Sequence, residues 1–210
     1  MSEEFELEAE PAIAERIFSA GIGQARDYAT ALVLDADLLG LLGPREMPKL
    51  WTRHILNSAV VSELVADGAT VADVGSGAGL PGIPMAIAQP KAHFTLIEPM
   101  ERRSNWLIEQ VDALGLTNVT VKRARAEEVG EVFDVVTARA VSALPKLLRL
   151  TVPLTRDGGV ILALKGSKAQ DEIAESKPLV KKLKIASFEV IQVGTEHLAE
   201  PTTVVRTTLV

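Results

Sequence analysis

Cysteine is absent from this chain of 210 residues, and long apolar runs are absent as well. Without a thiol the chain can hold no cysteine nucleophile, thiolate metal site or zinc ribbon, and we assign it no metal ligands. No stretch reaches the roughly 18 apolar residues that cross a membrane. The acidic segment 2–10 lacks the basic-then-apolar order of a signal peptide. The sequence therefore predicts a soluble, cytoplasmic protein with no membrane partner.

A surplus of basic charge is also missing, since 22 Lys and Arg face 28 Asp and Glu, a formal net charge of −6. The acidity lies at the start of the chain: residues 1–40 hold nine acidic and two basic side chains, whereas the remainder holds 19 acidic and 20 basic. The acidic head is typical of a solvated helix face with a frayed terminus. The rest can carry a basic face for nucleic acid despite the net charge.

The hydrophobic pattern changes character after Asp67-Gly68. Before it, apolar residues at helical spacing predict helices between about Pro11 and Ala66. After it, short β runs alternate with helical segments near 83–89, 101–114, 142–154 and 170–182, which is typical of a doubly wound, mostly parallel sheet. The β runs are Thr70–Val74, His93–Glu98, Val119–Lys122, Phe133–Ala138 and Gly159–Lys165.

Two further β runs, 185–193 and 202–209, have no clear helix between them and predict a hairpin at the sheet edge. We therefore expect an α/β fold with a seven-stranded sheet. Residues 1–66 form a helical extension packed on the core, and residues 67–210 form the main domain. An apolar content of 47% is enough to bury a full core.

A glycine-rich turn, D-x-G-x-G-x-G, begins at Asp73 and directly follows the first β run. Glycine has no Cβ and tolerates positive φ, so Gly75 and Gly77 allow a ligand to approach the backbone closely. A dinucleotide fingerprint needs its third glycine at position 80, which is Leu80. The pattern instead resembles the first motif of S-adenosylmethionine-dependent methyltransferases. The N–H groups of the turn can meet the methionine carboxylate, and Asp73 supplies charge near the amine.

Further site residues are expected where the other strands end, because ligands of open α/β sheets lie beyond the carboxyl ends of the strands. Glu98 follows Gly75 by 23 residues, near the spacing at which an acid meets the two hydroxyls of a ribose. Alternatively, Glu98 hydrogen-bonds to the start of the helix that begins at Glu101. Arg139 and Lys165 end later strands, where the alternative role is that of a solvated strand end.

Five segments in the same order resemble one family, the ribosomal RNA small-subunit methyltransferase G family, also called glucose-inhibited division protein B. The Leu-Pro-Gly-Ile-Pro tail of the glycine turn is more specific than its glycines. The resemblance implies the methyltransferase fold and transfer of a methyl group from S-adenosylmethionine to ring nitrogen 7 of a guanine in 16S rRNA, in the 530 loop of the small ribosomal subunit. We expect the chain to act as a monomer. The matching segments are Arg53–Ser58, Asp73–Pro84, Arg125–Glu128, Ala138–Ala140 and Ala163–Gly166.

The resemblance also implies roles for single residues. It assigns cofactor contacts to Gly75, Leu80, Ala126, Glu127 and Arg139. Among the basic residues of the matching segments, the resemblance makes Arg53, Arg125 and Lys165 candidates for contact with the substrate RNA. Candidates for catalysis are His54, Arg139 and Lys165. The segment 43–48 departs from the Asn-Leu-Thr of many members, which leaves the substrate contacts of this segment open.

Several of these side chains have a purely structural alternative. His54 stands among apolar residues, where a packed, hydrogen-bonded histidine is as well supported as a substrate contact. Trp51 and Trp106 fall at helical apolar spacing, which favours the core over stacking on a base. The basic run at Lys181, Lys182 and Lys184 is typical of a solvated helix face.

The residue content also bears on the chemistry. Guanine nitrogen 7 presents a lone pair and needs no general base, so alignment by Arg139 and exclusion of water can suffice. A cytosine carbon methyltransferase needs a cysteine, and an exocyclic-amine methyltransferase usually shows [D/N]-P-P-[Y/F] where this chain has Thr137–Ala140. The alternatives left are a small-molecule methyltransferase and a non-catalytic RNA-binding or ribosome-assembly factor. An NAD(P) oxidoreductase is disfavoured by Leu80.

Overall fold

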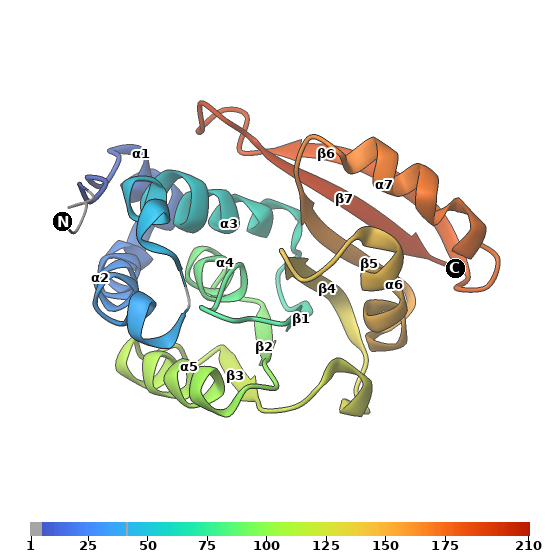
Figure 1. Cartoon of the computed structure of the whole chain (residues 1–210), viewed down its shortest axis with the longest axis horizontal. Coiled ribbons are helices and arrows are strands. Elements are labelled where there is room, and N and C mark those ends of the chain that lie inside the picture. Colours follow the sequence, from blue (N-terminus) through green and yellow to red (C-terminus); the bar gives the residue numbers. More distant parts are fainter. Residues whose placement is uncertain (1–5, 41) are drawn as a thin grey trace.

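A seven-stranded sheet forms the centre of the computed structural model, which describes residues 6–40 and 42–210 (Figure 1). The strand order is β3-β2-β1-β4-β5-β7-β6, with β1 to β5 parallel and β7 antiparallel to both of its neighbours. The prediction of a mostly parallel sheet closed by a hairpin is confirmed. The strands are β1 (Thr70–Val74), β2 (His93–Ile97), β3 (Val119–Lys122), β4 (Phe133–Arg139), β5 (Thr155–Lys165), β6 (Ile185–Val193) and β7 (Thr202–Leu209).

Helices cover both faces of the sheet, as a doubly wound fold requires (Figure 1). The first face carries α4 (Gly82–Ala88), α5 (Glu101–Ala113) and the N-terminal helices, and the second carries α6 (Leu144–Thr151) and α7 (Ala169–Ser176). The N-terminal part comprises α1 (Ile13–Phe18), α2 (Ile22–Leu39), a 3-10 helix (Pro44–Lys49), a π-helix (Leu50–Leu56), α3 (Asn57–Ala59) and a second 3-10 helix (Val60–Leu64).

Several predicted boundaries differ from the observed ones by a residue or more, and three of these differences have clear local reasons. Strand β5 begins at Thr155 instead of Gly159, because Thr155 pairs with Phe133 ahead of an irregularity in the ladder. The helix predicted at 142–154 begins at Leu144, where Pro145 suits the first turn. The helix predicted at 170–182 ends at Ser176 and continues only as a short 3-10 turn containing Pro178, which has no N–H to donate.

The N-terminal helices share one hydrophobic core with the sheet. Phe18 and Leu32 belong to the same buried cluster as Val71 of β1 and Leu96 of β2. Trp51 and Trp106 are also buried there, which confirms the prediction that both pack in the core. This packing brings residues of the extension to the edge of the sheet where β1 to β5 end.

Polar contacts fix α2 against the elements that carry the site. The Tyr28 hydroxyl donates a 2.6 Å hydrogen bond to the carbonyl of Ala78 in the glycine turn. The Trp106 indole N–H of α5 donates to Asp35 Oδ2 at 2.8 Å. In the part of the chain that the structure describes, no helix combines the length and apolar character needed to cross a membrane.

Candidate active site

The glycine turn between β1 and α4 has the backbone conformation that its sequence predicts. Gly75, Gly77 and Gly79 have φ values of +71°, +54° and +83°, which side-chain-bearing residues rarely adopt. A Cβ on Gly79 would lie 2.5 Å from Ile83 Cδ1, so this glycine lets α4 pack against the turn. A Cβ on Gly77 would meet nothing closer than the Gly75 carbonyl at 3.8 Å. The turn is therefore tight toward the protein and has space beside Gly77.

Asp73 is fully buried at the end of β1. Its Oδ2 accepts a 3.1 Å hydrogen bond from the N–H of Gly82, but its Oδ1 has no partner. Burial raises the pKa of Asp73 to about 7, against the lowering effect of Ser76 and Gly82. A buried carboxylate oxygen without a partner is costly, and a cationic group would satisfy it. The amine of S-adenosylmethionine fits this requirement.

The backbone N–H groups of the turn are less available than we expected from the sequence. Of the six N–H groups from Gly75 to Leu80, only that of Ala78 has no partner among the described residues. The sequence predicts that several N–H groups of the turn contact the methionine carboxylate of S-adenosylmethionine. In the structure only the Ala78 N–H is free to do so among the described residues. The others donate within the protein: Gly75 and Ser76 to the Ile97 carbonyl, Gly77 to Glu98, and Gly79 and Leu80 to the Ser76 carbonyl.

Glu98 follows β2 directly and is buried. Its Oε2 accepts the N–H of Gly77 at 2.9 Å, and its Oε1 accepts the N–H of Met100, the residue before α5, also at 2.9 Å. Glu98 therefore joins the glycine turn to the start of α5, and the expected bond to the helix start is present. Each carboxylate oxygen keeps a further lone pair that a ribose hydroxyl can use.

The other predicted cofactor residues lie at neighbouring strand ends. Leu80 is buried in the turn after β1, and Ala126 is buried in the 3-10 helix Ala126–Glu128 that follows β3. Glu127 beside it is exposed. Because β3, β2 and β1 are adjacent in the sheet, these residues share one half of its carboxyl edge with Asp73.

Arg139, the last residue of β4, is held by the N-terminal extension. Its Nη1 donates to the His54 carbonyl at 3.1 Å and to Ser58 Oγ at 3.0 Å, and its Nη2 donates to His54 Nδ1 at 2.5 Å. Burial lowers the pKa of Arg139, but arginine remains charged in proteins. The guanidinium is thereby fixed where the β4 end meets the extension.

His54 lies on the π-helix and uses both of its ring nitrogens within the protein. Nδ1 accepts from Arg139, so the ring proton lies on Nε2, which donates to Glu46 Oε2 at 2.7 Å. Burial, together with the charge of Arg139, lowers the pKa of His54 to about 4, so the ring is neutral at pH 7. These contacts favour the packed, hydrogen-bonded histidine over the expected catalytic contact with substrate. Glu46 belongs to the segment in which this chain departs from the family pattern.

Lys165 ends β5 but does not present a free ammonium group. Its Nζ lies 2.7 Å from Glu172 Oε2 of α7 and donates to the Ser142 carbonyl at 2.8 Å, and its side chain is only 9% exposed. Glu172 Oε2 also accepts the N–H of Leu144 at 2.6 Å. These contacts tie the loop after β4 to α7 and occupy the Lys165 ammonium in the free protein. A contact of Lys165 with RNA, or a role in catalysis, stays a prediction.

The two remaining basic predictions lie apart from each other. Arg53 has a side chain 58% exposed, and its Nη1 lies 3.8 Å from Glu46 Oε2. Arg125 is also exposed but follows β3, so that β2, β1 and β4 separate it from Lys165. The predicted RNA residues therefore do not form one cluster.

A hollow of about 650 Å³ lies beside Arg139. Ligand pockets in proteins have volumes of roughly 300–1,000 Å³, so it can take a nucleotide-sized group. Its residues at the start of β7 are not predicted from the sequence, because β7 runs antiparallel and its start, not its end, meets the carboxyl edge of β5. The hollow is lined by Arg53, Asn57, Arg139, Ala140, Leu164, Lys165, Gly166, Ser167, Pro201, Thr202 and Thr203.

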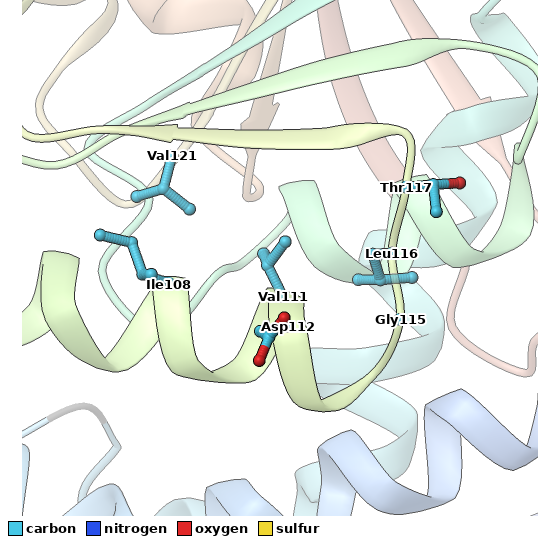
Figure 2. A pocket seen from close by; sticks show the side chains of 7 residues that line it. All are labelled: Ile108, Val111, Asp112, Gly115, Leu116, Thr117 and Val121. Carbon is cyan, nitrogen blue, oxygen red and sulfur yellow. The ribbon is translucent and has the colours of Figure 1, made fainter.

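A second hollow, of about 460 Å³, lies away from these residues, between α5 and the edge strand β3 (Figure 2). Figure 2 shows Val121 of β3 pointing toward Ile108 and Val111 of α5. None of the predicted site residues lines it. Among the described residues, no group of three or more His, Cys, Asp or Glu side chains is placed to hold a metal ion.

Comparison with known proteins shows the family to which the chain belongs. The family model described as rRNA small subunit methyltransferase G matches residues 22–199. This chain belongs to that family. It is 49% identical over 208 residues to ribosomal RNA small subunit methyltransferase G of Clavibacter michiganensis, covering 98% of both chains, and 53% identical over 200 residues to that of Arthrobacter sp. strain FB24, covering 94% and 93%.

Solved structures agree on the fold of this rRNA small subunit methyltransferase G family member. The crystal structure of M. jannaschii TYW2 in complex with AdoMet superposes with a TM-score of 0.58 at 21% sequence identity, covering 76% of each chain. At this identity the likeness concerns the fold alone. It confirms the expected sheet of the S-adenosylmethionine-dependent methyltransferase type.

Proposed function

We propose that this chain transfers a methyl group from S-adenosylmethionine to ring nitrogen 7 of a guanine in 16S rRNA, in the 530 loop of the small ribosomal subunit. The family membership across residues 22–199 is the observation that carries this proposal. The finer statement, which atom and which loop, rests on the resemblance of the sequence motifs to that family.

The arrangement of the site supports the proposal, because the candidate residues at the carboxyl edge of the sheet fall into two neighbouring groups. Asp73, the Ala78 N–H and Glu98 suit the amine, carboxylate and ribose of S-adenosylmethionine, which supplies the methyl group when bound. The hollow beside Arg139 lies at the ends of β4 and β5 and offers the space for a nucleotide. Cofactor and nucleotide would then occupy adjacent halves of the edge.

The chemistry requires positioning rather than proton transfer. Held by Asp73, the Ala78 N–H and Glu98, S-adenosylmethionine would supply its methyl group to the lone pair of guanine nitrogen 7 and leave as S-adenosylhomocysteine, so that the positive charge would pass from sulfur to the guanine ring. No proton leaves the base, which agrees with a His54 ring whose nitrogens are both engaged. Arg139 can donate to guanine oxygen 6, leaving nitrogen 7 free to react. Alignment of this kind lowers the barrier without a general base.

The proposal is tested with purified protein, labelled S-adenosylmethionine and small ribosomal subunits from cells that lack the protein. We expect one 7-methylguanine, found by mass mapping in the 530 loop, and loss of the label with Arg139→Ala. Label on small metabolites but never on the subunit would instead identify a small-molecule methyltransferase. Ribosome binding that persists without any transfer would identify an assembly factor.

A further inference from the structure

A third hollow adjoins the one beside Arg139. It has a volume of about 470 Å³ and is lined in part by Lys49, the residue before the π-helix, and by Thr52, an exposed residue of that helix. Both hollows have Arg53 and Asn57 in their walls. The two hollows therefore meet at Arg53 and Asn57, and together they are called the groove, which leads from the end of β4 along the N-terminal extension.

The groove is basic, although the chain as a whole is acidic. Of the residues that line it, four carry a positive charge, Lys49, Arg53, Arg139 and Lys165, and one carries a negative charge, Glu200. Lys165 is neutralised by Glu172 at 2.7 Å, whereas Arg53 lies 3.8 Å from Glu46 Oε2 and keeps a side chain 58% exposed. The charge that a ligand can reach therefore lies at Arg139, Lys49 and the exposed Arg53. A concentration of one sign of charge within a groove attracts a polyanion more strongly than the net charge suggests.

The groove is also lined by polar side chains that have no partner among the described residues. Lys49 is exposed, and none of the ion pairs or side-chain hydrogen bonds among the described residues involves its ammonium group or the side-chain amide of Asn57. The Asn57 carbonyl accepts a 2.8 Å hydrogen bond from the hydroxyl of Thr202, which joins the two walls of the groove. Lys49 and Asn57 are therefore free to donate to a ligand that lies between them.

We propose that this groove carries the single-stranded RNA next to the target guanine, with its phosphates passing from the guanine at Arg139 over Arg53 and Asn57 to Lys49. The inference rests on the proposed function and adds the route of the substrate. A helical duplex presents its phosphates on a broad cylinder that does not enter a groove of this size, whereas an unpaired loop strand can. Among the residues that the structure describes, no aromatic side chain lines either hollow, so the groove holds the backbone by charge rather than the bases by stacking.

The test compares charge reversal inside and outside the groove. Lys49→Glu is the groove variant, and Lys182→Glu is the matched control with the same change in charge. Lys182 is exposed and lies next to the start of β6, where Ile185 pairs with Leu209, at the opposite end of β7 from Thr202. Binding of a labelled single-stranded 16S rRNA fragment is measured by anisotropy across a salt series, with S-adenosylmethionine affinity and thermal unfolding measured for each variant.

We expect Lys49→Glu to weaken RNA binding about tenfold or more and to reduce the slope of log affinity against log salt by about one, since one phosphate contact is lost. Asn57→Ala weakens binding less and leaves the slope unchanged, because an amide carries no charge. Lys182→Glu matches the wild type, and cofactor affinity is the same in all four proteins.

Two failures can be told apart. If the wild type methylates the small subunit but Lys49→Glu and Lys182→Glu bind RNA equally well, the groove is overturned and the proposed function stands. If the wild type methylates no small-subunit RNA, the proposed function and the groove fall together.

Discussion

Arg139 is central to the proposed acceptor half of the site, the ends of β4 and β5 and the start of β7, where the target guanine would lie. Three hydrogen bonds hold its guanidinium, and all of them come from the segment 54–58 of the extension. Behind it, Glu46 holds the His54 ring in the tautomer that accepts from Arg139. Partners of this kind orient a functional side chain and fix its protonation state without touching the substrate.

Glu46→Ala tests this arrangement. Without the carboxylate, the Nε2–H of His54 loses its acceptor, the ring is free to change tautomer, and Arg139 loses one of its partners. We expect methyl transfer at saturating cofactor to fall roughly 10- to 100-fold, because small displacements of a positioning group are costly. Glu46→Gln, whose amide oxygen still accepts, should retain most of the activity. Equal activity of the Ala variant and the wild type would show that Glu46 does not position Arg139 through His54.

Asp73 gives the site a dependence on pH. Its pKa of about 7 in the free protein means that the carboxyl is largely protonated below neutrality, whereas an adjacent ammonium group requires the carboxylate. Affinity for S-adenosylmethionine should therefore rise about tenfold per pH unit between pH 5 and 7 and level off above. Calorimetry across this range measures it, and Asp73→Asn should bind weakly with a flat profile. A wild-type profile that is flat would contradict the assigned contact.

The same residue has the opposite effect on the stability of the free protein. Its folded pKa of about 7 lies above the ordinary value of 3.8, so the folded state binds the proton more tightly than the unfolded chain. The contribution of Asp73 to the free energy of unfolding should then decrease as the pH rises from about 4 to about 7. The lowered pKa of His54 makes an opposite contribution between about pH 4 and 6.5. The decrease is therefore measured as the difference in the free energy of unfolding between the wild type and Asp73→Asn, which should shrink as the pH rises.

At the scale of elements, the tail of the glycine turn joins β1 to α4. The N–H of Gly82 donates to Asp73, and a Cβ at this position would lie 2.3 Å from Leu96 Cδ2 and 2.7 Å from Asp73 Oδ2. The Leu-Pro-Gly-Ile-Pro sequence is specific for this reason: the first residue of α4 is packed against the end of the strand that carries the site.

Gly82→Ala should therefore lower the free energy of unfolding by about 1–3 kcal/mol, as overpacking of a full core does. Gly130→Ala is the matched control, because a Cβ there meets no atom within 4 Å. Urea unfolding of both variants measures the difference. A Gly82→Ala protein as stable as the Gly130→Ala protein would show that the turn has room for a side chain.

The loop between β4 and α6 depends on a partner from a later element. Glu172 of α7 pairs with Lys165 and accepts the N–H of Leu144, the first residue of α6. Within this loop Ala140 has a φ of +57°, a conformation that needs support from its surroundings. The loop also carries Val141, whose Cγ2 would lie 3.0 Å from a Cβ on Gly75.

Glu172→Ala leaves the Lys165 ammonium unpaired and the Leu144 N–H without an acceptor. We expect a loss of about 1–3 kcal/mol in stability and faster hydrogen exchange of the loop amides. Glu175→Ala, an exposed carboxylate on the same helix, serves as control. If both variants unfold at the same denaturant concentration, the Lys165–Glu172 pair contributes nothing to the loop.

At the scale of the whole molecule, the fold can be predicted from the sequence to a large extent. Strands such as 119–122 and 202–209 have their observed limits because each is a β-forming run bounded by turn residues. The cofactor half can be predicted too, since Asp73 and the glycines are neighbours in the chain and Glu98 follows the next strand.

The acceptor half cannot be predicted in the same way, because it is assembled from distant segments. The partner of Arg139 is 85 residues away at His54, and Thr202 meets Asn57 across 145 residues. No local sequence pattern indicates which basic side chain forms an ion pair in the fold and which does not. The sequence thus gives Lys165 and Lys49 the same positive charge, while the fold neutralises the first and leaves the second exposed.

On the scale of the whole sheet, we propose that the carboxyl edge divides into a cofactor half at β1 to β3 and an acceptor half at β4, β5 and β7. A crystal structure with bound S-adenosylhomocysteine, the product, tests this most directly. We predict its amine within hydrogen-bond distance of Asp73 Oδ1, its ribose at Glu98, and its sulfur facing the hollow beside Arg139. Product bound within that hollow, with Asp73 Oδ1 still lacking a partner, would contradict the account.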